Sequence, residues 1–216
     1  MTRCGTGTRL SPYPFSGREE MLPFVPAGAR TVLDVGCGSG GFGATLRRAG
    51  PARTVWGVEV LPDVAAQAGP HYDRVLVGAY PDALAGVERR FDCIVFNDVL
   101  EHLADPWATL RSTVPWLAPG GSVVASIPNV RNVRVVANLV LRGDWTYTDS
   151  GVLDRTHLRF FTARTIGELF ADSGFVVERL EGINVVGSGR FRFGGALRYV
   201  LREFAYTGFG VRATPA

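Results

Sequence analysis

Residues 32–40, VLDVGCGSG, carry an acid, Asp34, within an apolar run that leads directly into alternating glycines. The valines and the leucine favour a β-strand, and the glycines favour a tight turn because glycine adopts positive φ angles without strain. A strand that leads into a glycine turn is typical of the first strand of an open α/β sheet, where a nucleotide-like ligand lies against bare main chain. The pattern predicts such a ligand beside Gly36, Gly38 and Gly40.

The charge of two acids distinguishes between kinds of nucleotide-like ligand. The pyrophosphate of a dinucleotide is held by amide groups at a helix N-terminus, and a carboxylate such as Asp34 would repel it. S-adenosylmethionine instead presents an ammonium and a sulfonium, with which a carboxylate forms strong charge-assisted contacts. Glu59 ends the next apolar run, residues 54–60, where a ribose diol requires a carboxylate acceptor. Both acids therefore fit S-adenosylmethionine.

Four segments in register extend this pattern along the chain: VLDVGCGSG, GVEV at 57–60, FDCIVFNDVLEHLADPWATL at 91–110 and LAPGGSVVASIPN at 117–129. Together they resemble the class I S-adenosylmethionine-dependent methyltransferases, over roughly residues 18–213. The resemblance implies that Asn97 lines the methionine side of the donor. It also marks a departure, because Ala79 stands where the family often has an aspartate that contacts the adenine.

Two other functions are kept as alternatives. Residues 36–43 satisfy G-x-G-x-x-G literally, so a nicotinamide-dependent oxidoreductase is one of them. The other is a methyltransferase-like protein that binds a ligand without turnover. The preferred function is transfer of a methyl group from S-adenosylmethionine to a small-molecule acceptor, at an oxygen of a natural-product or sugar-like metabolite rather than at nitrogen or carbon.

The alternation of β-type and helical patterns predicts a Rossmann-like α/β fold, with a seven-stranded, mostly parallel sheet and helices on both faces. The resemblance adds an antiparallel last strand. Strands are expected near residues 31–36, 54–60, 73–77, 91–97, 121–127, 175–181 and 206–213. Helices are expected near residues 41–50, 62–69, 81–88, 104–117, 163–173 and 194–204.

Two parts of the chain are expected to lie outside the minimal sheet. Residues 1–30 are interpreted as an N-terminal loop and short helix that fold over the ligand, and residues 31–213 as the donor-binding domain. Residues 129–161 form an insertion after the fifth strand, where it would act as a lid and select the acceptor. Its aromatic residues either wall an acceptor pocket or form a small core, and we assign none of them as contacts: Trp145, Tyr147, Phe160 and Phe161.

Two histidines are the candidate catalytic residues. Methyl transfer to a hydroxyl requires removal of one proton, which suits an imidazole. His157 lies in the insertion, and Asp154, three residues earlier, is expected to orient its ring. His102 follows the fourth strand, on the acceptor side in the resembling family, where it either contacts the acceptor or is hydrogen-bonded within the start of a helix.

A divalent metal ion is the alternative role for this cluster. Asp98, Glu101 and His102 stand at i, i+3 and i+4, which places them on one face of a helical turn, and His157 would supply a fourth ligand. The spacing resembles the metal-binding acid-x-x-Glu-His of small-RNA 2'-hydroxyl methyltransferases and ubiquinone-pathway O-methyltransferases. Because Asp98 replaces their longer glutamate, the sequence does not favour a metal, and no metal ligand is assigned.

Composition limits the partners, the chemistry and the cellular location that the protein can have. The net charge of +3 is spread along 216 residues without a basic run, which favours a small-molecule partner over nucleic acid. All 23 basic residues are arginine, which excludes lysine-based chemistry. The three cysteines are scattered, and no apolar stretch approaches the roughly 18 residues of a membrane span, so we expect a soluble cytoplasmic protein without disulfides or an anchor. A homodimer is left open.

Overall fold

The computed structural model describes residues 15–50, 53–185 and 202–216. Its seven strands form one sheet in the order β3-β2-β1-β4-β5-β7-β6. β1 to β5 run parallel, whereas β7 is antiparallel to both β5 and β6. The predicted fold class is confirmed. The strands are β1 Thr31–Val35, β2 Thr54–Glu59, β3 Arg74–Val77, β4 Phe91–Asn97, β5 Leu117–Pro128, β6 Phe175–Val185 and β7 Tyr206–Pro215.

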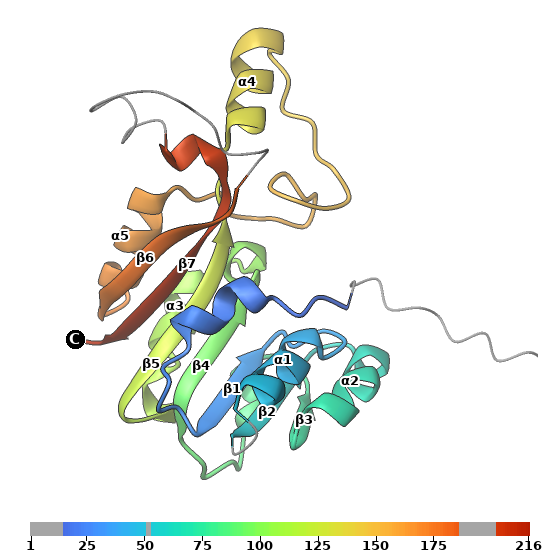
Figure 1. Ribbon diagram of the computed structural model, residues 1–216, viewed down its shortest axis with the longest axis vertical. Helices are drawn as coiled ribbons and strands as arrows, with labels where there is room; N and C mark the ends of the chain where they lie inside the picture. The colour runs from blue at the N-terminus through green and yellow to red at the C-terminus, as the bar shows by residue number, and fades with distance from the viewer. Residues whose placement is uncertain (1–14, 51–52, 186–201) are drawn as a thin grey trace, which may run out of the picture.

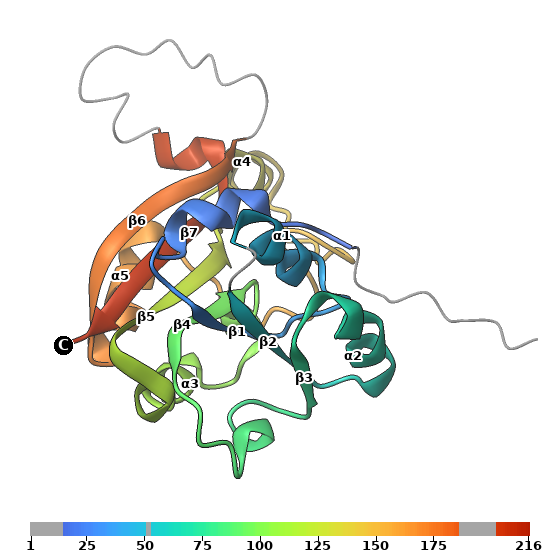
Figure 2. The same cartoon turned by 60° about the horizontal axis from the view of Figure 1, so that its bottom comes forward.

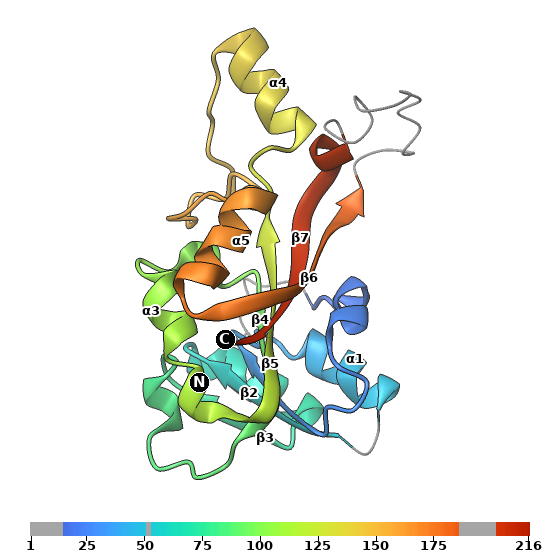
Figure 3. The same ribbon diagram turned by 90° about the vertical axis from the view of Figure 1, so that its left-hand side faces the viewer.

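Helices cover both faces of this sheet (Figure 3). On one face, α3 and α5 bury residues such as Leu110 and Phe170. On the other, α1 and the N-terminal 3-10 helix η1 bury residues such as Leu46 and Met21, and η1 lies between α1 and β7 (Figure 2). The α-helices are α1 Gly41–Ala49, α2 Pro62–Ala68, α3 Pro106–Arg111, α4 Val133–Arg142 and α5 Ala163–Asp172. The 3-10 helices are η1 Glu19–Phe24, η2 Gly69–His71, η3 Asp82–Leu84, η4 Leu100–His102, η5 Val114–Trp116 and η6 Glu203–Ala205.

Two predicted helices are wrong in extent. Residues 81–88 form only the single turn η3, which gives way to Gly86 at a φ of +76°. Residues 104–117 form α3 and then η5, because the ring of Pro115 in a continuous α-helix would clash with the carbonyl of Arg111, where α3 ends. The predicted helix at 194–204 lies mostly outside the described residues, and its end coincides with η6.

The insertion carries a helix that the sequence reading missed. α4 stands away from the sheet (Figure 1), and the chain then returns through a long loop. Asn129 and Phe161, the first and last residues of the insertion, form an isolated β-bridge, so the insertion leaves and re-enters the domain at one place. Within the described part of the chain, every helix is too short or too polar to cross a membrane. Cys37 and Cys93 are buried free thiols, and Cys4 lies outside the described residues.

Candidate active site

A cavity of about 590 Å³ opens at the carboxyl ends of β1, β2 and β4. This is the edge of a parallel sheet where ligands of α/β proteins bind. All of the predicted site residues except Gly40 line it. It also receives Ser16 and Arg18 from the N-terminal segment and His157 from the insertion. The fold therefore brings together groups from both of the regions that the sequence reading placed outside the minimal sheet.

The glycine turn after β1 has the backbone geometry that its sequence requires. Gly36, Gly38 and Gly40 have φ angles of +72°, +53° and +97°, which side chains strongly disfavour. A Cβ atom on Gly36 would lie 2.6 Å from Cγ2 of Val99. The turn therefore presents bare main chain to the cavity, as expected, and Gly40 supports it from outside the cavity wall.

Asp34 is 1% exposed at the end of β1. Its Oδ2 accepts a 2.5 Å hydrogen bond from the hydroxyl of Tyr72, whereas its Oδ1 is buried without a partner. Burial raises the pKa of this carboxyl to about 7, against the lowering effects of the Tyr72 hydrogen bond and the charge of Arg18. An unpaired buried carboxylate oxygen costs several kcal/mol, so Oδ1 is suited to a cationic ligand.

Glu59 and Asn97 lie on either side of Asp34. The Glu59 carboxylate, at the end of β2, accepts the backbone N–H groups of Gly38 and Leu61 at 3.0 Å each. These bonds fix the carboxylate beside the glycine turn. Asn97 ends β4, and both polar atoms of its side chain are buried without partners. A side chain that only closed its strand would have paired these atoms with the backbone.

Arg18 is a site residue that the sequence reading missed. Its guanidinium pairs with the Asp98 carboxylate and donates to Ser126 Oγ at 2.8 Å, and it is the arginine among the residues that line the cavity. Ser126 Oγ in turn donates to Asp98 Oδ1 at 2.8 Å. A lone arginine in a proline-rich segment gave no signal, because its partners lie 80 and 108 residues away.

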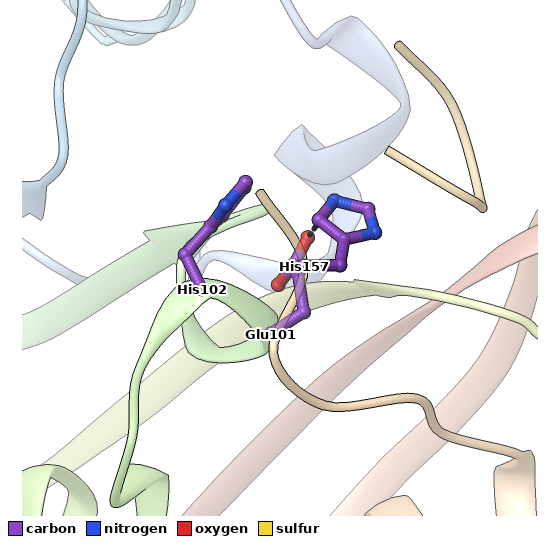
Figure 4. A group of neighbouring side chains, drawn as sticks. All are labelled: Glu101, His102 and His157. Atoms are coloured by element: carbon purple, nitrogen blue, oxygen red, sulfur yellow. Dashed lines mark ion pairs between the residues drawn. The ribbon is translucent and has the colours of Figure 1, made fainter. Parts of the chain in front are cut away.

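The side of the cavity that the sequence predicts as the acceptor side is built on η4, which carries Glu101 and His102, and on His157 from the insertion (Figure 4). Nε2 of His157 lies 3.9 Å from Oε1 of Glu101. The centroids of the His102 and His157 rings are 4.7 Å apart. Glu101 is 1% exposed, and both of its oxygens lack a hydrogen-bond partner. Burial, reinforced by the nearby Asp98, raises its pKa well above the usual range. A buried carboxyl thus faces the imidazole.

The hydrogen bonds of the two imidazoles define their tautomers. Nδ1 of His157 lies 3.1 Å from the carbonyl oxygen of Val152, which can only accept, so Nδ1 carries the proton and Nε2 offers a lone pair. The ring is thus oriented by a backbone carbonyl, and the expectation that Asp154 orients it is wrong. Asp154 instead accepts from the backbone N–H and the hydroxyl of Thr156.

His102 is held on the same side of the cavity. Because the Thr156 hydroxyl donates its proton to Asp154, its oxygen accepts from Nδ1 of His102 at 3.1 Å. Burial, together with the neighbouring His157, lowers the pKa of His102. The ring is therefore neutral near pH 7, and it contacts the insertion rather than only the start of its own helix.

The four-residue metal set expected as an alternative is not brought together. Asp98 has a φ of +52° and precedes η4 rather than belonging to it, and its carboxylate is held by Arg18 and Ser126. Ligand atoms of Glu101, His102 and His157 do lie within 4.8 Å of one another. With the unpaired oxygens of Glu101, this trio offers the mixed oxygen and nitrogen donors that a divalent ion accepts.

The aromatic residues of the insertion form a small cluster of their own. The rings of Trp145 and Tyr147 contact Phe160 at centroid distances of 5.3 and 6.2 Å, and Phe161 belongs to the main core. None of the four is among the described residues that line the cavity. The insertion residues that do line the cavity are instead polar or glycine: Ser150, Gly151, Asp154, Thr156 and His157. At the position of the family's missing adenine aspartate, Ala79 does line the cavity.

The family is identified at this point by comparison with known proteins. A family described as "Methyltransferase domain" matches residues 6–180, and the chain belongs to that family. Its sheet order and antiparallel β7 are those of the Rossmann-like class I S-adenosylmethionine-dependent methyltransferases, so the resemblance seen in the sequence is confirmed. The nicotinamide oxidoreductase is accordingly set aside.

Curated relatives and solved structures agree with this family. A ubiquinone biosynthesis O-methyltransferase of Xanthomonas axonopodis is 31% identical over 140 residues, covering 57% of this chain and 57% of that protein. One of Parvibaculum lavamentivorans is 29% identical over 160 residues, covering 70% and 61%. The chain thus spans less than two thirds of either relative's length.

The structures that resemble this one are distant in sequence. A SAM-dependent methyltransferase from Archaeoglobus fulgidus matches with a TM-score of 0.65 at 18% identity, covering 90% of this chain and 89% of that one. An O-methyltransferase from neocarzinostatin biosynthesis, solved with S-adenosyl-L-homocysteine and 1,4-dihydroxy-2-naphthoic acid, matches with a TM-score of 0.57 at 18% identity, covering 95% and 52%. At this identity the likeness concerns the fold.

Proposed function

We propose that this protein transfers the methyl group of S-adenosylmethionine to a hydroxyl oxygen of a polar small molecule, of the natural-product or sugar-like kind. One observation carries the proposal. A single cavity is lined by Asp34, whose Oδ1 is buried without a hydrogen-bond partner, and by His157, whose Nε2 offers a lone pair. The first suits a cationic donor and the second accepts the proton that a hydroxyl must lose.

The residues at the donor end fit S-adenosylmethionine. Asp34 Oδ1 would pair with the donor's ammonium, and the Glu59 carboxylate would accept from the ribose hydroxyls. The main chain at Gly36 and Gly38 would lie against the nucleoside. Asn97, with both polar atoms unpaired, would hydrogen-bond the methionine part. Arg18 would attract the donor's carboxylate, because opposite charges meet in a partly dry site.

At the acceptor end, His157 is proposed as the general base. Its Nδ1–H is fixed by the Val152 carbonyl, so Nε2 accepts the hydroxyl proton while the new carbon–oxygen bond forms. The buried Glu101 carboxyl, with Oε1 3.9 Å from Nε2, borders the position at which the acceptor hydroxyl would approach the ring. His102, held by Thr156, contacts the acceptor beside it. When the methyl group has moved, the donor product is S-adenosylhomocysteine and the proton rests on His157.

Two segments are proposed to enclose the reactants. Ser16 and Arg18 bring the N-terminal segment to the cavity, and a Cβ on Gly41 would lie 2.1 Å from the Ser16 carbonyl oxygen, so this segment packs against the start of α1. The insertion contributes Ser150, with Thr156, to the acceptor side. We propose that both act as lids over the cavity in the domain of residues 31–213, and that the polar insertion loop selects the acceptor.

Calorimetric titration with S-adenosylhomocysteine tests the donor assignment. Micromolar binding is expected, and NAD or NADP should give no heat. A flat titration at millimolar S-adenosylhomocysteine contradicts the proposal. Incubation of the full chain with labelled S-adenosylmethionine and a panel of hydroxylated aromatics and sugars should transfer label to oxygen. Donor binding without transfer to any of them would favour the non-catalytic alternative.

A chelator tests the metal alternative at the trio of Glu101, His102 and His157. With a general base alone, we expect turnover to survive EDTA. Loss of turnover in EDTA with recovery on addition of Mg²⁺, Mn²⁺ or Zn²⁺ would assign the trio as ligands to a metal ion instead. In either case the acceptor is a small molecule, because the sequence offers no basic run for nucleic acid.

A further inference from the structure

Tyr72 is a buried residue that the sequence reading did not single out. It directly follows η2, is separated from β3 by Asp73, and is 4% exposed. Its hydroxyl donates to Asp34 Oδ2 at 2.5 Å and accepts the backbone N–H of Gly43, in the first turn of α1, at 3.0 Å. The hydroxyl therefore joins the end of β1 to the start of α1.

Two observations indicate that this arrangement is built into the chain. A Cβ atom on Gly43 would lie 2.4 Å from Cζ of Tyr72, so only glycine at that position allows the ring to reach Asp34. Because the hydroxyl oxygen accepts from Gly43, its proton is free to point at Asp34. The pKa of Tyr72 is raised well above its usual range by burial and by the charge of Asp34, so the hydroxyl remains a donor.

The consequence for Asp34 is an asymmetric carboxylate. One oxygen, Oδ2, is satisfied by Tyr72, whereas Oδ1 is buried without a hydrogen-bond partner, and Asp34 lines the cavity. A carboxylate held at one oxygen cannot rotate to share its charge elsewhere. We propose that Tyr72 is a positioning residue for the methyl donor, which holds Asp34 so that Oδ1 is presented to the donor's ammonium. This inference rests on the donor-binding role of Asp34 in the proposed function.

The charged groups around Asp34 act in opposite directions on its ionisation. Burial raises its pKa most, the Tyr72 hydrogen bond and the Arg18 charge lower it, and Glu59 raises it. The Cys37 thiol, from the glycine turn, is itself kept protonated by burial and by Asp34. Removal of the Tyr72 hydroxyl should therefore raise the pKa of Asp34, so that donor binding requires a higher pH.

The experiment is calorimetry of S-adenosylhomocysteine from pH 6 to 9 with the full chain and Tyr72→Phe. In the wild type, affinity should rise with pH and level off above about 7. In Tyr72→Phe the midpoint should move upward, and a rise of about one unit would make affinity about fivefold weaker at pH 7 and leave it largely recovered at pH 9, because the ionised fraction at pH 7 falls from about one half to about one tenth. The ammonium of the ligand titrates alike in every variant, so the difference between variants reports Asp34.

A matched control removes a different tyrosine hydroxyl. Tyr206 accepts from Arg202 at 2.7 Å and does not line the cavity, so Tyr206→Phe should leave both affinity and midpoint unchanged. A loss in Tyr72→Phe that is the same at every pH, or an unchanged titration, would overturn the positioning role. Incorporation of 3-fluorotyrosine at position 72 keeps the ring and makes the hydroxyl more acidic. It should lower the midpoint, and a midpoint that stays or rises overturns the proposal as well.

Asp34→Asn separates this inference from the proposed function. If Asp34 holds the donor, Asp34→Asn should weaken binding and flatten its pH dependence, and the added Tyr72→Phe should cause no further loss. Wild-type affinity in Asp34→Asn would contradict the proposed donor site itself. Weak binding in Asp34→Asn with an unshifted midpoint in Tyr72→Phe would contradict only the role of Tyr72.

Discussion

The donor and acceptor ends of the cavity each contain a buried carboxyl, and the two are supported differently. Asp34 lies at the end of a strand and has one oxygen fixed by Tyr72. Glu101 lies on a single 3-10 turn, and both of its oxygens lack a hydrogen-bond partner. The donor end is therefore largely formed before any ligand arrives, whereas the acceptor end depends on contacts between η4 and the insertion. A preformed donor end suits a ligand whose structure does not vary, and the acceptor end suits acceptors that differ in structure.

The largest expected effect tests whether the two ends act separately. His157→Ala removes the proposed base without touching the donor end, so turnover should fall about 10²- to 10⁴-fold while S-adenosylhomocysteine affinity stays within about twofold. Steady-state kinetics and calorimetry measure the two quantities. An equal loss of turnover and of S-adenosylhomocysteine affinity would mean that the two ends do not act separately. His157→Gln is the control, because it retains a polar side chain at this position.

The free energy of unfolding tests the cost of the unpaired carboxylate. The pKa of Asp34 is raised to about 7 in the folded state, so between about pH 4 and 7 the folded protein binds more protons than the unfolded chain, and stability falls as pH rises. Without ligand, Asp34→Asn should therefore be more stable than the wild type at pH 8, by on the order of 2–4 kcal/mol. Urea unfolding at pH 4 and pH 8 measures this. A difference in stability between Asp34→Asn and the wild type that is the same at pH 4 and pH 8 would contradict this expectation.

A substitution at Gly36 tests the contact of the glycine turn with Val99, which joins the donor end to the acceptor end. Gly36→Ala introduces a Cβ at a φ of +72° and 2.6 Å from Val99, the residue before η4. We expect donor affinity to fall about 30-fold, equivalent to about 2 kcal/mol of strain and displacement. Gly28→Ala is the control, because a Cβ there meets nothing within 4 Å. An unchanged affinity in Gly36→Ala would show that the turn does not contact the donor.

The smallest expected effect concerns the N-terminal segment. Arg18→Gln should weaken the donor about tenfold, because it removes the cation beside the proposed carboxylate of the donor while the network of Asp98 and Ser126 keeps a partner of similar length. Arg48→Gln, on an exposed ion pair with Glu19, is the matched control and should have no effect. If Arg18→Gln lowered turnover but not donor affinity, Arg18 would belong to the acceptor end.

The same contrast decides what the sequence could predict. The donor end could be predicted because Asp34 and Glu59 lie at the ends of strands that local apolar runs reveal, and the glycines follow the first of these strands. The ends of parallel strands meet at one edge of the sheet. The acceptor end was only partly readable. His102 and His157 were found as candidates, but the partner of His157 is the backbone carbonyl of Val152, which no pattern of side chains reveals.

Long-range partners explain the rest of what was missed. Arg18 reaches Asp98 across 80 residues, and Tyr72 reaches Asp34 across 38. The helical spacing of Asp98, Glu101 and His102 suggested one face, yet Asp98 lies outside the turn because Arg18 and Ser126 hold it. The helix α4 was missed although its signals stand in the sequence: Asn132 caps its start by accepting from the backbone N–H of Arg134, and Gly143 ends it at a φ of +63°.

A crystal structure of the full chain with S-adenosylhomocysteine gives the most direct test of the account. We predict that the ligand's ammonium lies within hydrogen-bond distance of Asp34 Oδ1, and that its sulfur points toward Nε2 of His157. A ligand with its amino-acid part turned away from Asp34, or with its sulfur shielded from His157, would contradict the account.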